Sequence, residues 1–312
     1  MPAPGATNVK YLAAWAKQVE QATDNKIKVT VFPGETLLKA QDVLEGVQGG
    51  VADIAWVTLG YFPGRFPATE IMSLPGLYLP EGVKNSRILQ QLFEKFPDMQ
   101  KEFKGVKVLH LNASDPFSLF TTKKPVKTLA DMKGMKIRET NGPYPQKMWE
   151  RLGASSVALP MPQVYESFQK GVVDGISSGW GGLLTFRLYE VLKYWTANSG
   201  NSSTLFAMVI NEDKWKSLSP ELQKAVMSVS GVAGAELGGA QAFGPGVYAA
   251  AQNAMKPGGF TVERVELEAA DLAKFKETAR SMWEEWVKEV TAKGVNGRAI
   301  LDEATRLIDQ NK

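Results

Sequence analysis

The clearest catalytic pattern in the chain is Gly-Ile-Ser-Ser-Gly at 175–179, which matches the G-x-S-x-G turn of a serine nucleophile. In that chemistry Ser177 would attack a carbonyl carbon while a histidine removes its proton. The chain has one histidine, His110, and it precedes Ser177, whereas the histidine follows the serine in the α/β-hydrolase order. The glycine-rich segment GWGG follows the motif, not a helical pattern. A serine hydrolase is therefore only a remote alternative.

The other reactive side chains favour binding over catalysis. Without cysteine there is no thiolate or disulfide chemistry, and one histidine cannot build a histidine-rich metal site. His110 lies in an apolar, strand-like run, which predicts a structural role. The sequence has neither a G-x-x-x-x-G-K-[ST] phosphate loop nor a G-x-G-x-x-G after a strand, and nothing marks two of its 33 acidic residues as a pair. We expect no cofactor, no metal site and no enzymatic activity.

An arginine at the end of a predicted strand suggests a different chemistry. In GMKIRET (134–140) apolar and basic residues alternate as in a half-buried strand, and Asn-Gly-Pro at 141–143 then turns the chain. Arg138 could be an ordinary surface charge. It could equally bind an anion, because a guanidinium offers a planar fork of donors that fits a carboxylate. The pattern alone leaves both interpretations open.

Length and composition narrow the class of protein. A chain of 312 residues favours two domains, and 44% hydrophobic with 22% charged residues is typical of globular proteins. The net charge of +3 does not indicate a nucleic-acid binder. No window approaches the roughly 18 uncharged apolar residues of a membrane span.

Helical and strand patterns alternate along most of the chain. We expect helices within 7–26 (with Thr7 or Asn8 as its cap), 39–50, 144–153 and 162–171, and a mostly helical C-terminal third from Ser219. We expect strands at 26–32, 51–57, 106–111, 135–139, 155–160, 172–177 and 204–211. This alternation favours α/β architecture with largely parallel pairing.

One segment of the first half is echoed in the second half. LEGVQGGVADIA (44–55) aligns without a gap on YESFQKGVVDGI (165–176), with five of twelve positions identical. Each copy reads as a helix, a glycine stop and a strand, and each follows a strand closing on proline (29–33 and 157–160). A repeated βαβ unit suggests two similar lobes with a ligand cleft at the carboxyl ends of their strands. Arg138 ends one of these strands.

Several motifs, in order along the chain, resemble the solute-binding proteins of TRAP transporters, of the C4-dicarboxylate-binding type. These motifs are VFPGETLLKAQDVLEGVQGGVADIAWV (31–57), SLPGLY (73–78), the segment from GMKIRET to KGVVDG (134–175), YEVLKYWT (189–196) and INEDKWKSLSPELQKAV (210–226). The resemblance covers nearly the whole chain. It implies a periplasmic binding protein fold of two lobes, each a mainly parallel sheet flanked by helices. We expect lobe 1 to hold 1–115 with about 205–245, and lobe 2 to hold 116–204 with about 246–312.

The resemblance also implies a ligand site. In the family the arginine that ends this strand binds the ligand carboxylate, which here is Arg138. Several other family positions depart from the common pattern. Ser118 stands where many members have a second basic residue, Ser178 stands near an asparagine position, and Trp180 follows. Met161 matches a pocket-facing position that is often aromatic, and Trp56 lies at the cleft end of its strand. Ser114, Asn141 and Ser178 are candidate hydrogen-bonding residues.

These departures keep one cation and add apolar surface to the expected pocket. They predict a monocarboxylate with an aromatic or apolar body, such as an aromatic or indolyl acid, stacked on aromatic walls. A C4-dicarboxylate or a sugar acid is the alternative within the same family.

The resemblance further implies partners and a location. The expected partners are a small organic acid anion and the membrane permease subunits of a TRAP transporter, in the periplasm. A sensor that presents the same lobes to a signalling partner is not separable by sequence. The family's usual first strand and the export signal do not precede PAPGATN. We therefore expect that both were trimmed ahead of Met1.

Overall fold

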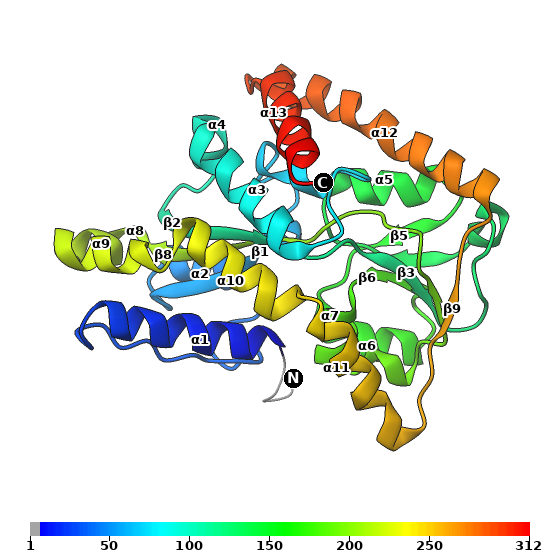
Figure 1. The fold of residues 1–312 in the computed structure, drawn as a ribbon, viewed down its shortest axis with the longest axis horizontal. Helices are drawn as coiled ribbons and strands as arrows, with labels where there is room; N and C mark the ends of the chain where they lie inside the picture. The colour runs from blue at the N-terminus through cyan, green and yellow to red at the C-terminus, as the bar shows by residue number, and fades with distance from the viewer. Residues whose placement is uncertain (1–6) are drawn as a thin grey trace.

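The computed structural model describes residues 7–312, which form two lobes, each with its own sheet (Figure 1). Lobe 1 carries the sheet β1-β8-β2, and lobe 2 carries the sheet β5-β4-β6-β3-β7-β9. The strands of lobe 1 are β1 (Ile54–Thr58), β2 (Val106–Ala113) and β8 (Leu205–Asn211). Those of lobe 2 are β3 (Ser118–Thr121), β4 (Lys136–Arg138), β5 (Ser155–Val157), β6 (Gly175–Ser178), β7 (Tyr194–Thr196) and β9 (Glu263–Val265). The α/β class and the two-lobed fold are confirmed.

The expected parallel pairing is correct only in part. In lobe 2, β4 pairs in parallel with β5 and β6, and β7 with β9, but β3 is antiparallel to both of its neighbours. In lobe 1, β8 is antiparallel to both β1 and β2. The reason is the path of the chain between the lobes. β2 leads out of lobe 1 and β8 leads back into it, so the two strands run in opposite directions.

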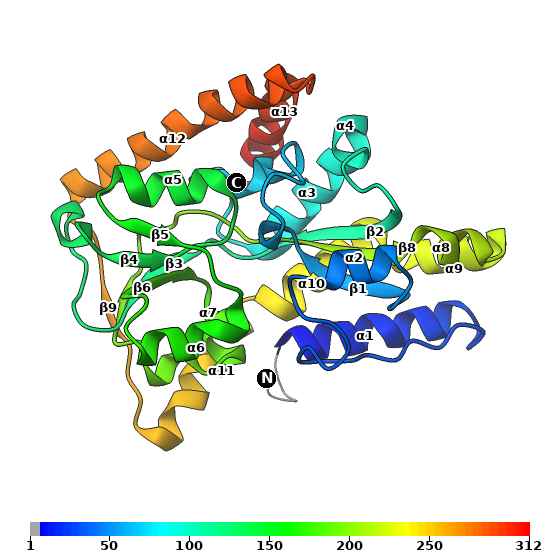
Figure 2. The same cartoon turned by 180° about the vertical axis from the view of Figure 1, so that it is seen from behind.

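Helices cover the sheets and join the lobes (Figure 2). On the lobe 1 side are α1 (Thr7–Ala22), α2 (Val43–Gln48), α3 (Gly82–Lys95), α4 (Pro97–Gln100), α8 (Glu212–Ser217), α9 (Pro220–Ser228) and α10 (Gly231–Phe243). On the lobe 2 side are α5 (Pro143–Arg151), α6 (Met161–Gln169), α7 (Trp180–Thr185) and α11 (Gly246–Met255). The long α12 (Ala269–Ala292) packs on α5, whereas α13 (Gly297–Gln310) packs on α3, so the C-terminal segment touches both lobes.

The strand expected at 26–32 does not form, and that prediction was wrong. The segment has no strand partner, and side chains of the preceding helix and turn bind its backbone. Ile27 N donates to Thr23 Oγ1 and Val29 N donates to Glu20 Oε1. The alternation in sequence reflects Ile27 and Val29 packing into the core under α1. Packing of alternate residues against the core thus reproduces a strand pattern without a sheet.

The two copies of the sequence repeat share a helix, a glycine and a following strand, but not the strand expected before the helix. In both copies a helix (α2, α6) is followed by a glycine and then a strand (β1, β6). The matching glycines, Gly50 and Gly171, have φ of +77° and +67°, a conformation that L side chains rarely adopt. Only the second copy has the preceding strand, β5. The strand expected ahead of Met1 lies outside the described residues.

Two crossing segments join the lobes side by side. Ser114 N donates to Thr204 O, Phe117 N donates to Ser202 O, and these bonds tie the outgoing segment to the returning one. The paired crossings hold the ends of β2 and β8 next to lobe 2, and a cavity lies beside them.

Residues 7–312 include no helix that is both long and apolar enough to cross a membrane.

Candidate functional site

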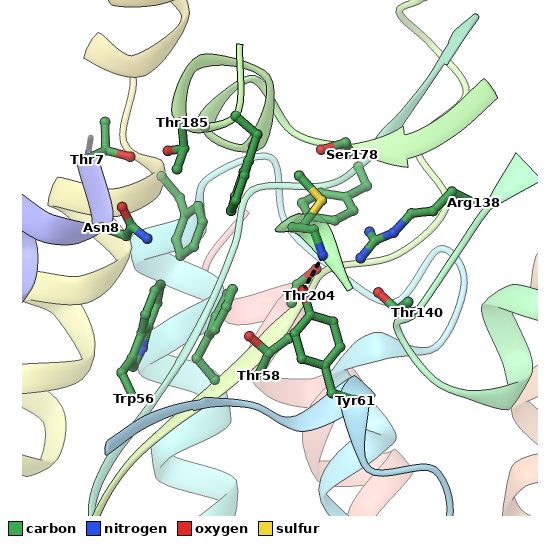
Figure 3. Close-up of a pocket in the computed structure, with 17 residues that line it drawn as sticks. Thr7, Asn8, Trp56, Thr58, Tyr61, Arg138, Thr140, Ser178, Thr185 and Thr204 are labelled. Atoms are coloured by element: carbon green, nitrogen blue, oxygen red, sulfur yellow. Dashed lines mark hydrogen bonds between the residues drawn. The ribbon is translucent and has the colours of Figure 1, made fainter. Parts of the chain in front are cut away.

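A cavity of about 120 Å³ lies between the lobes (Figure 3). Both lobes and the segments that join them contribute to its lining. The lining residues are Thr7, Asn8, Trp56, Thr58, Tyr61, Phe117, Arg138, Thr140, Met161, Ser178, Gly181, Gly182, Thr185, Phe186, Thr204, Phe206 and Phe243. Arg138 is the only charged residue among them. The site is therefore a mostly apolar chamber with a single cation.

Arg138 ends β4 and is only 2% exposed. Its Nε donates to the carbonyl oxygen of Leu159 at 2.8 Å, which fixes the direction of the side chain. Among residues 7–312, no acidic group pairs with Arg138, and the buried Nη2 has no hydrogen-bond partner. The guanidinium points into the cavity (Figure 3). Because an isolated buried charge is costly, this arrangement calls for an anion at the free edge of the guanidinium.

Aromatic rings from lobe 1 form an opposing wall. Trp56 stacks on Phe206 with ring centroids 4.3 Å apart and 16° between planes, and Phe206 stacks on Phe243 at 5.1 Å and 19°. The indole Nε1 of Trp56 donates to Asn112 Oδ1 at 3.0 Å, so the ring's polar atom is already paired. Together these rings line the cavity with an apolar aromatic surface against which an apolar ligand body can pack.

The two lobes touch at the edge of the cavity. Met161 N, at the start of α6, donates to the hydroxyl of Tyr61 from lobe 1 at 3.0 Å. Next to it, a Cβ added to Gly60 would lie 1.8 Å from Thr140 O, so only glycine permits this approach of backbones. The contact therefore closes one side of the cavity.

A second buried charge supports the segment that carries Arg138. Glu139 is fully buried, and its Oε1 accepts from Thr140 N and Asn141 N, both at 2.9 Å. Its Oε2 accepts from Trp149 Nε1 at 3.1 Å and from Asn201 Nδ2 at 3.2 Å. The carboxylate thus joins the turn after β4 to α5 and to the crossing segment.

Four of the eight site residues predicted from sequence line the cavity: Trp56, Arg138, Met161 and Ser178. The other four do not. Trp180 packs its ring edge-on against Phe120 and Trp195, each at 5.2 Å, within the lobe 2 core. Ser118 begins β3 and faces Ala197 O at a distance of 3.5 Å. Apolar packing and sheet pairing, respectively, place these two side chains away from the cavity.

Asn141 and Ser114 lie directly behind the lining. Asn141 Nδ2 donates to Ser202 Oγ at 2.9 Å, and its Oδ1 accepts from Thr204 Oγ1 at 2.6 Å. Ser114 Oγ donates to Asp115 O at 2.7 Å and accepts from Thr204 N at 3.0 Å. Both residues therefore hold Thr204, which lines the cavity, and they do not line it themselves.

The serine and histidine of the remote hydrolase alternative lie in different lobes. Ser177 is in β6, and its buried Oγ has no partner among the described residues. His110 is in β2, where its Nε2 hydrogen-bonds with the hydroxyl of Tyr11 at 2.5 Å. Burial lowers the pKa of His110 to about 3, so the ring stays neutral. The expected structural role of His110 fits this geometry, and a nucleophile–base pair does not. Residues 7–312 hold no cluster of three potential metal ligands.

Sequence reasoning missed much of the aromatic wall and the far end of the cavity. Phe206 lies in a predicted strand, and its partner strand β1 was also predicted, but the antiparallel pairing of the two and its register were not. The observed register puts Thr58 opposite Phe206 and Trp56 opposite Met208, which makes Trp56 and Phe206 diagonal neighbours. Asn8 was expected only as a helix cap, and Phe243 and Tyr61 had no distinguishing signal.

Comparisons with known proteins agree with this architecture. The family model for bacterial extracellular solute-binding protein, family 7, matches residues 1–289. A TRAP periplasmic solute-binding protein from Bordetella bronchiseptica, crystallised with bound (R)- and (S)-mandelate, is 29% identical with a TM-score of 0.89, covering 100% of this chain and 97% of that one.

Two further relatives differ in the ligands that their names state. A marine metagenome TRAP solute-binding protein specific for aromatic acid ligands, in complex with 3-hydroxybenzoate, is 31% identical with a TM-score of 0.88, covering 99% of this chain and 96% of that one. The 2,3-diketo-L-gulonate-binding periplasmic protein of Escherichia coli (strain K12) is 30% identical over 233 residues, covering 73% of this chain and 70% of that protein.

Proposed function

The chain belongs to bacterial extracellular solute-binding protein family 7, the solute-binding family of TRAP transporters, and from this premise we propose that it binds an aromatic monocarboxylate through Arg138. The proposal places it in the periplasm, where it would deliver the acid to a TRAP membrane permease. The family consists of substrate-binding proteins of transporters, not enzymes.

The observation that carries the proposal is the unmet charge of Arg138. Its guanidinium is 2% exposed, faces the cavity, and has no acidic partner among residues 7–312. A ligand carboxylate would supply the missing charge through two parallel hydrogen bonds, because only Nε is occupied, by Leu159 O. Removing one partner of a buried ion pair costs about 3–5 kcal/mol.

The rest of the lining supports an aromatic body. The stacked rings of Trp56, Phe206 and Phe243 give an apolar aromatic wall. The cavity volume of about 120 Å³ is of the same order as the roughly 150 Å³ of an apolar cavity that admits benzene, so it limits the ligand body to a single small ring. Mandelate and 3-hydroxybenzoate, which the structural relatives bind, are acids of this size and class.

The alternative ligands fit the lining less well. A C4-dicarboxylate would bury a second negative charge, and among the described lining residues only Arg138 is cationic. A sugar acid, the ligand class of the Escherichia coli relative, would set many hydroxyl groups against stacked aromatic rings. A sensor with the same lobes would bind the same ligand, so the site does not distinguish it from a transport receptor.

A thermal-shift screen tests the proposal. Purified protein is heated with benzoate, mandelate, an indolyl acid, succinate and glucuronate, each beside the Arg138→Ala variant. A ligand at 100 times its Kd should stabilise the protein by about 2.7 kcal/mol, which raises Tm by a few degrees. We expect shifts with the aromatic acids that disappear in Arg138→Ala. A shift only with succinate or glucuronate would refute the aromatic ligand. Shifts of equal size in the variant would refute the role of Arg138.

A further inference from the structure

The cavity has a second polar end, remote from Arg138. Asn8 at the start of α1 and Thr185 at the end of α7 line this end, with Thr7 beside them. Figure 3 places the three side chains on the side opposite Arg138, with aromatic rings between the two ends. A ligand anchored at Arg138 and stacked on the rings would therefore extend toward this second group.

The amide of Asn8 presents a donor to the cavity. Its Oδ1 accepts from Val9 N at 2.9 Å, and this bond identifies which side of the amide faces the helix. The nitrogen Nδ2 is left for another partner, and Figure 3 shows it on the cavity side. Among residues 7–312 no acceptor binds it.

The hydroxyl of Thr185 is also unmatched. Thr185 is only 5% exposed, so its hydroxyl has little access to bulk water. No side chain or backbone group within residues 7–312 hydrogen-bonds to it, although it lines the cavity. A hydroxyl that lines the cavity without a protein partner is free to hydrogen-bond with a ligand atom there.

The charge at this end determines what kind of group fits there. Among the described residues that line it there is no lysine, arginine or histidine, so none of these would pair with a second carboxylate. Asn8 Nδ2 requires an acceptor, whereas a threonine hydroxyl can either donate or accept. A neutral hydroxyl matches both, because its oxygen accepts from the amide while its proton is donated to the threonine.

We propose that the ligand is an aryl carboxylic acid with a hydroxyl on the part of its ring remote from the carboxylate, bound by Asn8 and Thr185. The inference rests on the proposed function and adds the chemical identity of the second group. It makes Asn8 and Thr185 specificity-determining residues, while Arg138 supplies the shared anchor for all carboxylates.

Calorimetry with matched ligands tests the inference. Benzoate, 3-hydroxybenzoate and 4-hydroxybenzoate are titrated into the wild-type protein, with 2-hydroxybenzoate as the control whose hydroxyl lies next to the carboxylate. At least one of the 3- and 4-isomers should bind about fivefold more tightly than benzoate, the gain typical of one neutral hydrogen bond, and the 2-isomer should not.

Two variants then assign the gain to the proposed residues. Thr185→Val keeps the shape of the side chain and removes only the hydroxyl. Asn8→Ser keeps an oxygen near Val9 N and removes the amide donor. Each should reduce the ratio of the affinities for the hydroxylated acid and for benzoate, both measured on the same variant, and far-UV circular dichroism confirms that each is folded.

The outcomes separate this inference from the proposed function. If no hydroxylated isomer binds more tightly than benzoate, or if the preference persists in both variants, the second site is refuted while an aromatic receptor stands. If Arg138→Ala binds benzoate as well as the wild type does, the carboxylate anchor itself is refuted. Loss of the preference in either variant, with benzoate binding retained, supports the inference.

Discussion

Arg138 and Glu139 are neighbours in sequence, and both are almost fully buried, yet the protein treats their charges in opposite ways. On the cavity face, Arg138 has one hydrogen bond, from Nε to Leu159 O, and no acidic partner within residues 7–312. On the opposite face, four donors surround the Glu139 carboxylate. Alternation along the end of β4 sends the two side chains to opposite sides.

The comparison teaches how to separate a binding charge from a structural one. A carboxylate with four donors has its interactions complete before any ligand arrives, so it serves the fold. A guanidinium with a free edge at a cavity is stabilised fully only when a ligand binds. Such a group lowers the stability of the ligand-free protein, and the bound ligand restores that stability in the complex.

Replacing Arg138 should have the largest effect of the changes considered. Arg138→Met removes an uncompensated buried charge and keeps much of the side-chain volume. We expect aromatic acid affinity to fall at least 100-fold, because about 3–5 kcal/mol of pairing is lost. The ligand-free protein should unfold at the same or a higher temperature. Calorimetry and thermal unfolding without ligand measure the two quantities. A lower Tm for the free variant would break the comparison, because it would make Arg138 a structural charge as well.

Replacing Glu139 should lower the stability of the protein and leave ligand affinity nearly unchanged. Glu139→Gln keeps the shape but exchanges an oxygen for an NH2 group that faces donors. At least two donors would lose their acceptor, so we expect the free energy of unfolding to fall by about 3 kcal/mol. Urea unfolding of the ligand-free protein measures this loss. In the fraction that is folded, affinity should change far less than in Arg138→Met. An unchanged unfolding midpoint would show that the network around Glu139 does not hold the fold.

A third buried ionisable group near the same segment, Glu70, is kept protonated instead of being paired. Glu70 is 7% exposed and faces Gly142, whose added Cβ would lie 3.4 Å from its carboxyl carbon. Burial, reinforced by the nearby carboxylate of Glu102, raises the pKa of Glu70 to about 8. The unfolded chain releases this proton above about pH 4.5, whereas the folded protein keeps it until about pH 8.

Stability should therefore fall as pH rises through that window. The folded state binds one more proton than the unfolded state, which gives a slope of about −1.4 kcal/mol per pH unit from this group. Glu70→Gln, which cannot titrate, should flatten the decline. Urea unfolding of both proteins at pH 5.5, 6.5 and 7.5 measures the difference in slope. Parallel curves would mean that Glu70 titrates normally in the folded protein.

The sequence predicted the charge at the cavity better than it predicted the walls. Alternation in GMKIRET is a local signal, and it placed Arg138 at the end of a buried strand before any tertiary contact was known. Trp56 was predicted from the family resemblance, at the cleft end of its strand, and it lies in the middle of β1 and lines the cavity. The period of the strand located Arg138, but the expected contact of Arg138 and Trp56 with a ligand came from the resemblance to TRAP solute-binding proteins.

The failures depended on contacts between distant segments. Whether Phe206 meets Trp56 depends on the antiparallel register of β8 on β1, which no local pattern encodes. Trp180 was predicted at the cavity, but its ring fits a gap beside Phe120 and Trp195 in the core. Segment 26–32 alternates as a strand does, yet nothing in its own residues shows whether a neighbouring strand will be present. Packing decides each of these cases.

The smallest predicted effect concerns the contact between the lobes at the cavity edge. Tyr61→Phe removes the hydroxyl that accepts from Met161 N and leaves the ring in place as part of the lining. One net hydrogen bond is worth about 1 kcal/mol, so ligand affinity should fall about fivefold, mainly through faster release. The Glu139 network and the Arg138 anchor should be unaffected.

Stopped-flow release of an aromatic acid measures this effect. The matched control is Tyr165→Phe, because the Tyr165 hydroxyl donates to Glu190 at 2.8 Å and does not line the cavity. A release rate that rises in Tyr61→Phe but not in Tyr165→Phe would assign part of the affinity to a contact that the ligand itself never makes. Equal rates in both variants would mean that the ligand, held at Arg138 and by the aromatic wall, keeps the lobes together without this bond.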